Sequence, residues 1–331
     1  MKKKNTSFII TVIILIALII VFSFFVWKYR PTKIDKKPKK ENIKETFQPE
    51  EEKESLEDRI NKCLTTPLPE EEITESLNTK INTLNDLFSK NKLNFSYYYS
   101  DITTGYSLSY NENGENWAAS VIKAPVVIYI YRLASEGKID LNEKLTYTSG
   151  FYAEGTGKIR YQKVNTKYTI RTLVEYAVKY SDNIAHRMLV KHFGMDNIKE
   201  YWRNLGSTSI FENNKIFSNF NAKDGYIVMK ELYDFSKENE YGKELLDYFK
   251  AAKPNFVTGD KDDEIAHKYG WGQSSLHDMT IIFDENPYIL IVFTTRGQTS
   301  YANFFKDVSA KINEIHKEYN ELKTNYCNNI Q

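Results

Sequence analysis

The sequence of 331 residues contains few of the residues that build metal centres. It has two cysteines, Cys63 and Cys327, and five histidines. Neither residue type shows the paired spacing of a zinc site, so we expect no metal ion and no cofactor. The two cysteines lie far apart in the sequence, and this spacing fits either one disulfide or two free thiols.

An excess of charge of one sign is also missing. The chain has 45 Lys and Arg against 44 Asp and Glu, which gives a net charge of +1. Without a strong overall field, we expect no nucleic-acid partner. A phosphate-binding loop is absent as well, because Gly155-Thr156-Gly157 is followed by Lys158-Ile159 and not by Lys-Ser or Lys-Thr.

The longest hydrophobic run lies close to the start of the chain. Residues 8–27 are uncharged and nearly all apolar, which is long enough for a helix to cross a bilayer. No small-residue cleavage site follows, so we predict a basic segment over 1–6 and a transmembrane signal anchor over 7–27. More basic residues follow the span than precede it, and this charge rule places the rest of the chain in the cytoplasm.

Residues 28–69 are strongly charged, first Lys-rich and then Glu-rich. This composition cannot bury enough apolar surface to fold alone. We therefore predict a charged tether over 28–69, with room for a short helix over 56–63. The remaining domain is predicted over 70–325.

The hydrophobic periodicity beyond the tether changes twice along the chain. After a helix that opens at Pro69, strands are predicted over 93–100 and 105–110. Strands return over 265–270, 277–284 and 287–295, and a helix over 304–320 closes the chain. Between these parts the pattern predicts helices over 120–135, 169–180, 183–192, 195–205, 222–238 and 242–250.

This order of elements predicts an α/β plus α fold. An antiparallel sheet built from both chain ends, with flanking helices, would carry an inserted all-helical lobe. We assign the α/β part to 70–119 and 255–325, and the lobe to 120–254. A cleft is expected between the two.

The first chemical motif is Ser120-Val121-Ile122-Lys123, at the change from a polar to an apolar run. Three residues along a helix return a side chain to the same face, so Lys123 would lie beside Ser120. A partly buried lysine can be neutral and can take the proton of a serine hydroxyl. The pattern is weak alone, because it recurs over 135–138 with a glycine inside it.

Two further motifs strengthen the first. Ser181-Asp182-Asn183 lies where one predicted lobe helix ends and the next begins. Lys268-Tyr269-Gly270 lies on the first returning strand, whereas a second Lys-x-Gly pattern over 223–225 falls at the start of a helix. Over about residues 70–322, the three motifs in these contexts resemble the penicillin-recognising serine hydrolases and, within them, the class A β-lactamase-like group.

The resemblance implies a role for each motif residue. Ser120 would be the acylated nucleophile, Lys123 its proton acceptor, and Ser181 the proton donor to the leaving nitrogen. Asn183 would hold the substrate amide, and Lys268 would attract the substrate carboxylate.

Other residues would shape the substrate site. Tyr269, Gly270 and Trp271 would line it, and the backbone N–H groups of Ser120 and Trp271 would form the oxyanion hole. Asp182 is predicted to cap the helix that follows it.

Two departures from the resembled pattern bear on activity. Class A β-lactamases use a loop glutamate in a Glu-x-x-Leu-Asn pattern to activate the deacylating water. Residues 206–221 contain Glu212 but not that pattern, and Glu212 reads as a solvated loop acid. Tyr269 stands where Thr or Ser is usual, which would alter carboxylate recognition. Arg296 would supply either a second positive group or a surface salt bridge.

The sequence therefore predicts a single-pass membrane protein. The function implied by the motifs, against the charge rule, places its serine hydrolase domain outside the cytoplasm. The expected substrate is a β-lactam or a D-alanyl cell-wall peptide, with β-lactam deacylation in doubt, and the expected state is a monomer. The alternative is a degenerate module that binds penicillin or peptidoglycan without hydrolysis. The resemblance also implies that Cys63 pairs with Cys327, because the first and last helices of that fold pack together.

Overall fold

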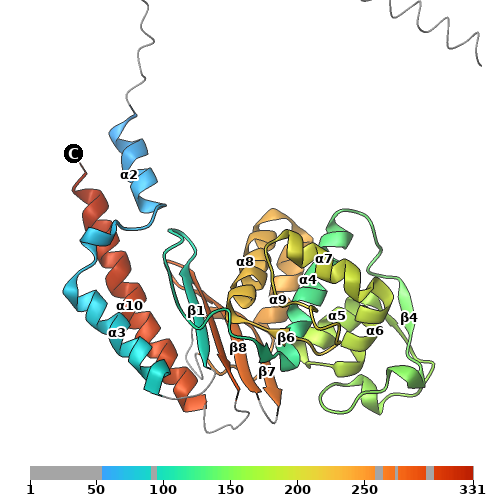
Figure 1. Ribbon diagram of the computed structural model, residues 1–331. Helices are drawn as coiled ribbons and strands as arrows, with labels where there is room; N and C mark the ends of the chain where they lie inside the picture. Colours follow the sequence, from blue (N-terminus) through green and yellow to red (C-terminus); the bar gives the residue numbers. More distant parts are fainter. Residues whose placement is uncertain (1–53, 91–94, 258–263, 273–274, 296–301, 331) are drawn as a thin grey trace, which may run out of the picture. The chain divides into compact units, whose positions relative to one another are not determined.

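A five-stranded antiparallel sheet drawn from both ends of the chain is the centre of the fold (Figure 1). The computed structural model describes residues 54–90, 95–257, 264–272, 275–295 and 302–330. The strand order is β2-β1-β9-β8-β7. The strands are β1 (Ser96–Asp101), β2 (Ser107–Tyr110), β7 (Glu264–Gly272), β8 (Ser275–Phe283) and β9 (Tyr288–Thr294). The predicted assembly of the sheet is confirmed.

Helices surround this sheet and fill the insertion between β2 and β7. They include α2 (Leu56–Leu64), α3 (Glu75–Lys90), α4 (Lys123–Ser135), α5 (Ile170–Lys179), α6 (Asn183–Phe193), α7 (Met195–Asn204), α8 (Ala222–Glu238), α9 (Glu240–Lys250) and α10 (Ala302–Asn328). Two short strand pairs lie outside the main sheet: β3 (Asn116–Trp117) with β6 (Asn219–Phe220), and β4 (Lys144–Thr146) with β5 (Lys167–Thr169).

The main sheet has a hydrophobic core on each face, and β9 shows why. Ile289, Ile291 and Phe293 face the core shared with the helical lobe. Leu290 and Val292 alternate with them and face the core built with α3 and α10. A strand buried on both faces needs a continuous apolar run, and the sequence of β9 supplies one.

Helix α4 is the centre of the lobe, because nine of its 13 residues are buried and none is exposed. It contacts the other large lobe helices, and α8 connects the lobe to the sheet by packing on β1, β8 and β9 (Figure 1). The N-terminus of α4 therefore lies where lobe and sheet meet, which is the place predicted for the cleft.

Several elements differ from the prediction at their ends. Ser120 lies in a 3-10 turn, η2 (Ala119–Ile122), and not in the α-helix itself. The helix predicted to open at Pro69 is a 3-10 turn over Glu70–Glu72 followed by α3. The closing helix continues to Asn328, eight residues beyond the predicted end.

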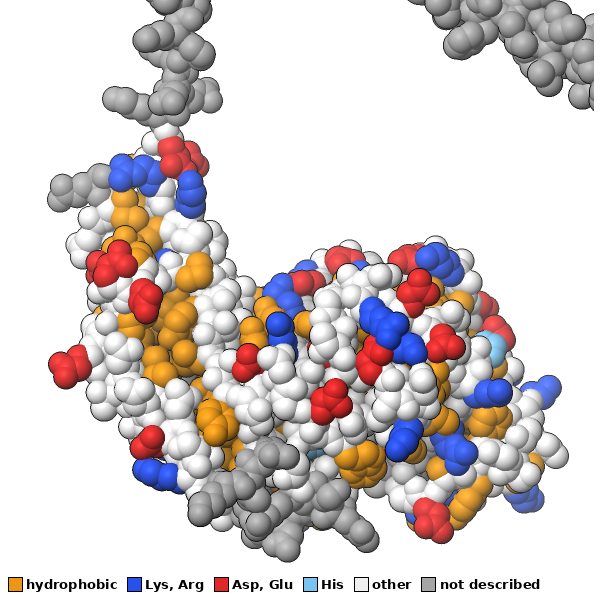
Figure 2. Space-filling view, in the orientation of Figure 1, with side chains coloured by type: hydrophobic (Ala, Val, Ile, Leu, Met, Phe, Trp, Pro, Cys, Tyr) orange, Lys and Arg blue, Asp and Glu red, His pale blue; other side chains and the backbone are white. Residues whose placement is uncertain are grey.

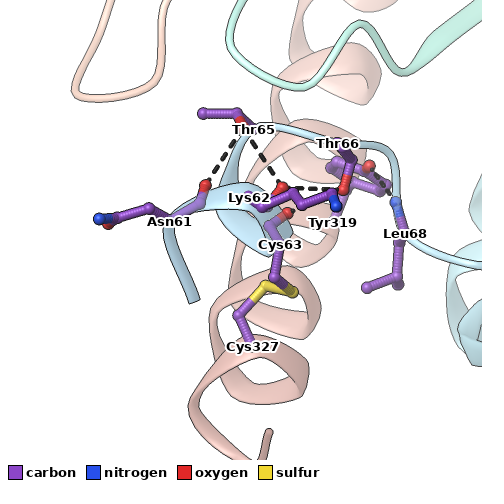
Figure 3. Close-up of a disulfide and its surroundings, with 8 residues drawn as sticks. All are labelled: Asn61, Lys62, Cys63, Thr65, Thr66, Leu68, Tyr319 and Cys327. Atoms are coloured by element: carbon purple, nitrogen blue, oxygen red, sulfur yellow. Dashed lines mark hydrogen bonds between the residues drawn. A yellow bond between two sulfur atoms is a disulfide. The ribbon is translucent and has the colours of Figure 1, made fainter. Parts of the chain in front are cut away.

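The extension of α10 meets the first described helix at a disulfide (Figure 3). Cys63 of α2 is bonded to Cys327 of α10, with Cα atoms 5.7 Å apart. Near it, the Leu68 backbone N–H donates a hydrogen bond of 2.9 Å to the Tyr319 hydroxyl. The pairing implied by the resemblance is confirmed, and it fastens part of the predicted tether to the closing helix.

Figure 2 shows acidic and basic side chains interspersed over the face in view, in line with the net charge of +1. Within the described ranges, no helix is long and apolar enough to cross a membrane. The anchor predicted over 7–27 lies outside the described residues, as does Arg296.

Candidate active site

The Ser120 hydroxyl is presented by the η2 turn that leads into α4. The preceding residue, Ala119, has a φ of 47°, a conformation that is costly for a residue with a Cβ atom. The Ala118 N–H donates a hydrogen bond of 2.9 Å to the Ser218 carbonyl, beside the short β3–β6 pair. These contacts hold a strained turn in place, and Ser120 stays half-buried at its surface.

Lys123 begins α4 one turn after Ser120, and its side chain is fully buried. Its Nζ lies 2.6 Å from Ser120 Oγ, 2.8 Å from Asn183 Oδ1 and 3.4 Å from Ser181 Oγ. Burial lowers the pKa of Lys123 well below 10.5, and the nearby charge of Lys268 lowers it further, while the Asp182 carboxylate opposes the shift. A lysine in this setting can be the neutral amine that accepts a serine proton.

Asp182 fixes the turn that carries Ser181 and Asn183. One of its carboxylate oxygens accepts hydrogen bonds from the backbone N–H groups of Ile184 and Ala185, at 2.9 and 3.0 Å, and so caps α6. The other accepts two N–H bonds from the preceding loop, at 2.7 and 2.9 Å. The predicted role of Asp182 as a helix cap is confirmed.

The loop over residues 155–157 packs directly against this turn. Gly157 has a φ of 128°, and a Cβ atom there would lie 2.4 Å from Asp182 Cγ. Only glycine can adopt this backbone and allow so close an approach. The Thr156 hydroxyl also donates a hydrogen bond of 2.7 Å to the Ser181 carbonyl, which helps to hold Ser181 at its own φ of 52°.

Asn183 has a single orientation because of its two partners. Its Nδ2 donates a hydrogen bond of 2.7 Å to the Glu154 carbonyl, so Oδ1 is turned toward Lys123. An amide oxygen at 2.8 Å receives an N–H of the lysine and leaves the Lys123 lone pair free to point at Ser120.

Lys268 reaches the same point from β7 and is also fully buried. Its Nζ lies 3.2 Å from Ser181 Oγ and donates a hydrogen bond of 2.9 Å to the Tyr269 carbonyl. Burial lowers the pKa of Lys268 to about 7, against the opposing effect of the Asp278 carboxylate. The Ser181 hydroxyl therefore lies between two lysines, one from the lobe and one from the sheet.

At Gly270, strand β7, which carries Lys268, passes very close to the η2 turn that carries Ser120. A Cβ atom on Gly270 would lie 2.9 Å from the Ala118 carbonyl oxygen and 3.1 Å from the backbone nitrogen of Ser120. Any larger residue would push β7 away from η2. The next residue, Trp271, is 51 % exposed at this edge, and Tyr269 is largely buried beside Lys268.

The loop over residues 206–221 supplies a further wall of the site. The Phe217 ring lies 5.5 Å from Lys123 Nζ. Behind it, the buried His186 ring is 3.0 Å from the Ile216 carbonyl through Nε2. Burial and the charge of Lys123 lower the pKa of His186 to about 3, so this imidazole stays neutral. Glu212 of the same loop is ion-paired with Arg203 at the surface.

The structure brings Ser120, Lys123, Ser181, Asn183 and Lys268 together, and Tyr269, Gly270 and Trp271 follow along β7. Sequence reasoning missed Phe217. It took residues 155–157 as a loop at the rim, and missed their packing against Asp182. The two closely spaced glycines of that loop indicate tight packing, but the sequence does not show which segment they pack against. Phe217 gave no signal, because it lies in a polar loop without periodicity.

Residues 78–316 match the family described as "Beta-lactamase enzyme family". The chain is 25 % identical over 273 residues to the β-lactamase BRO-1 of Moraxella catarrhalis. The matched region covers 74 % of this chain and 85 % of that protein.

Solved structures share the fold. An acyl-enzyme complex of a PBP-A mutant with penicillin G superposes with a TM-score of 0.67 at 20 % identity, over 73 % of this chain and 97 % of that one. A β-lactamase from Sphaerobacter thermophilus DSM 20745 gives a TM-score of 0.63 at 17 % identity, over 71 % and 95 %. The family match covers most of the chain, and the chain is a serine hydrolase that belongs to the β-lactamase enzyme family.

Proposed function

We propose that this protein forms an acyl-enzyme on Ser120 with a β-lactam or a D-alanyl cell-wall peptide and releases the acyl group slowly. The observation that carries the proposal is the 2.6 Å separation between Lys123 Nζ and Ser120 Oγ, at a lysine whose pKa burial holds low. This arrangement supplies both a nucleophile and a base whose neutral form is favoured by burial.

Acylation proceeds through residues whose positions are already favourable. Lys123 takes the Ser120 proton as Oγ attacks the substrate carbonyl carbon, and the backbone N–H groups of Ser120 and Trp271 stabilise the oxyanion. Ser181, within reach of Lys123 at 3.4 Å, passes a proton to the leaving nitrogen as its bond to the carbonyl carbon breaks. Asn183 orients Lys123 and binds the substrate amide.

Slow release follows from the wall formed by residues 206–221. Hydrolysis of the acyl ester needs a water molecule whose proton is removed as it attacks. Phe217 puts an aromatic ring beside Lys123, where a carboxylate would serve as that base, and Glu212 is ion-paired elsewhere. An enzyme with this wall keeps its acyl group for longer than an efficient β-lactamase does.

Labelled penicillin tests the reaction directly. We expect a covalent adduct on Ser120 of the full chain, stable over many minutes, and none on Ser120→Ala. Ser135→Ala, in the second Ser-x-x-Lys pattern, is the matched control and should be labelled like the wild type. An adduct that turns over within seconds would refute slow release, and an unlabelled wild type would refute the enzymatic proposal.

We also propose that the domain lies outside the cytoplasm, although the charge rule for the predicted anchor points the other way. The Cys63–Cys327 disulfide supports this placement, because structural disulfides persist in oxidising compartments. A protease added to intact spheroplasts should cut the tether over 28–69 and release the folded domain. Release only after the membrane is permeabilised would place the domain inside.

A further inference from the structure

The Tyr269 side chain covers the Lys268 ammonium group. Lys268 Nζ lies 4.3 Å from the centre of the Tyr269 ring, 2.9 Å from the Tyr269 carbonyl oxygen and 3.2 Å from Ser181 Oγ. An ammonium has three N–H groups, and these three contacts account for all of them. An anion that approached Lys268 would have to displace one of these partners.

The ring that covers Lys268 is itself firmly held. Tyr269 is 9 % exposed, and its ring packs edge-on against Phe256 at 6.0 Å between centroids. Phe256 is fixed in turn, because its N–H donates a hydrogen bond of 2.8 Å to Asp278. Asp278 pairs in register with Tyr269 on the neighbouring strand. A side chain packed in this way does not swing aside without cost.

Among the described residues, the buried Asp278 carboxylate on the neighbouring strand places a negative charge near Tyr269. Its Oδ1 lies 2.9 Å from His267 Nδ1. A second carboxylate close to it would be repelled. Burial and the Asp278 charge raise the pKa of the Tyr269 phenol, so the phenol stays neutral. Burial also lowers the pKa of Lys268 to about 7, because it disfavours the charged form.

We propose that Tyr269 sets substrate specificity by occupying the place beside Lys268 and Ser181 that a substrate carboxylate would take. The site then gains little from a carboxylate on the leaving group, so a β-lactam or D-alanyl donor is recognised through its other groups and an uncharged, amide-capped donor reacts about as well. This inference rests on the acyl transfer to Ser120 proposed above and specifies how that site recognises the leaving group.

A matched pair of substrates tests the inference. The two thioesters share one acyl group, and their leaving groups are thioglycolate, which carries a carboxylate, and thioglycolamide, which does not. The measured quantity is the ratio of kcat/KM for the two. Comparing this ratio between variants removes the intrinsic difference in reactivity, because the same two substrates are used throughout.

We expect the wild type to show no preference for the carboxylate. Tyr269→Thr should raise the kcat/KM for the thioglycolate ester, relative to that for the thioglycolamide ester, by about tenfold or more. A factor of this size is usual for a hydrogen-bonded charge pair. Tyr269→Phe keeps the ring and should keep the wild-type ratio. Thermal unfolding of each variant confirms that the fold is retained.

Each remaining outcome has a distinct meaning. A wild type that prefers thioglycolate at least tenfold, or a Tyr269→Thr variant with an unchanged ratio, overturns the role of Tyr269 and leaves acyl transfer intact. If neither thioester acylates Ser120, as read by intact-protein mass, the proposed function fails and the inference fails with it.

Discussion

The Ser181–Asn183 turn and the loop over residues 206–221 face the same lysine, Lys123, and each is held by one buried aspartate. Asp182 accepts four backbone N–H bonds and fixes the turn. Asp224 accepts the N–H groups of Thr208 and Ser209, and the hydroxyls of Ser207 and Ser209, and fixes the loop. The two walls are anchored by the same physical means.

What the two walls bring to Lys123 differs. The turn brings Ser181 Oγ and Asn183 Oδ1, which are polar groups suited to proton transfer. The loop brings the Phe217 ring, which can neither donate nor accept a proton in the reaction. In the proposed mechanism, one wall supplies groups for forming the acyl-enzyme and the other supplies no base for hydrolysing it.

Removing the base should have the largest effect. Lys123→Met keeps the volume of the side chain but removes the amine, so the rate of acylation by penicillin should fall roughly 10³- to 10⁴-fold. The control is Lys138→Met, in the exposed second copy of the pattern, which should acylate at the wild-type rate. Equal losses in both variants would contradict the role of Lys123.

Next in size is the loss of either anchor. Asp182→Asn and Asp224→Asn each leave buried N–H groups facing an amide, and each should lower the free energy of unfolding by about 2–4 kcal/mol. Urea unfolding measures this loss.

The two anchor variants should differ in acylation. Asp182→Asn displaces Ser181 and Asn183 and should slow acylation at a temperature where the protein is folded. Asp224→Asn should leave acylation nearly unchanged. If Asp224→Asn slows acylation as much, the two walls do not have separate roles.

A single substitution in the loop over residues 206–221 should supply the missing base, with a smaller effect than the changes above. Phe217→Glu places a carboxylate beside Lys123 and should speed release of the acyl group by about tenfold or more, because a general base then becomes available. Phe217→Gln is similar in size and has no base, so its acyl-enzyme should decay at close to the wild-type rate. Equal acceleration by Gln would mean that simple loosening of the loop admits water.

The smallest expected effect is a shift in the pH profile. The positive charge of Lys268 helps to lower the pKa of Lys123. In Lys268→Met that charge is gone, so the protonated form of Lys123 is less disfavoured and its pKa rises. The acid limb of the acylation rate against pH should therefore move to higher pH. An acid limb that stays in place or moves to lower pH would show that the two lysines are not coupled.

Several helix starts could be predicted closely from the sequence because their caps are local. Thr169 accepts a hydrogen bond of 3.1 Å from the Thr172 N–H, and Asn221 one of 2.7 Å from the Asp224 N–H. Asp182 acts in the same way for α6. A cap needs only residues two or three positions apart, so α5, α6 and α8 begin within a residue of their predicted starts.

Elements that depend on distant partners could not be predicted. The β3–β6 pair joins Asn116 to Phe220 across more than a hundred residues, and two-residue strands carry no periodicity of their own. The last turns of α10 pack on α2 and are tied to it at Cys327, so its true end depended on a partner far away in the sequence.

The sequence by itself determined the spacing of Ser120 and Lys123, the cap at Asp182 and the strand that carries Lys268, because each depends on neighbours within a few residues. Only the tertiary structure decided that Phe217 faces Lys123 and that the Tyr269 ring covers Lys268. Those contacts join segments or side chains whose approach is set by packing against distant elements, and a burial that lowers the pKa of both lysines arises only when lobe and sheet close together.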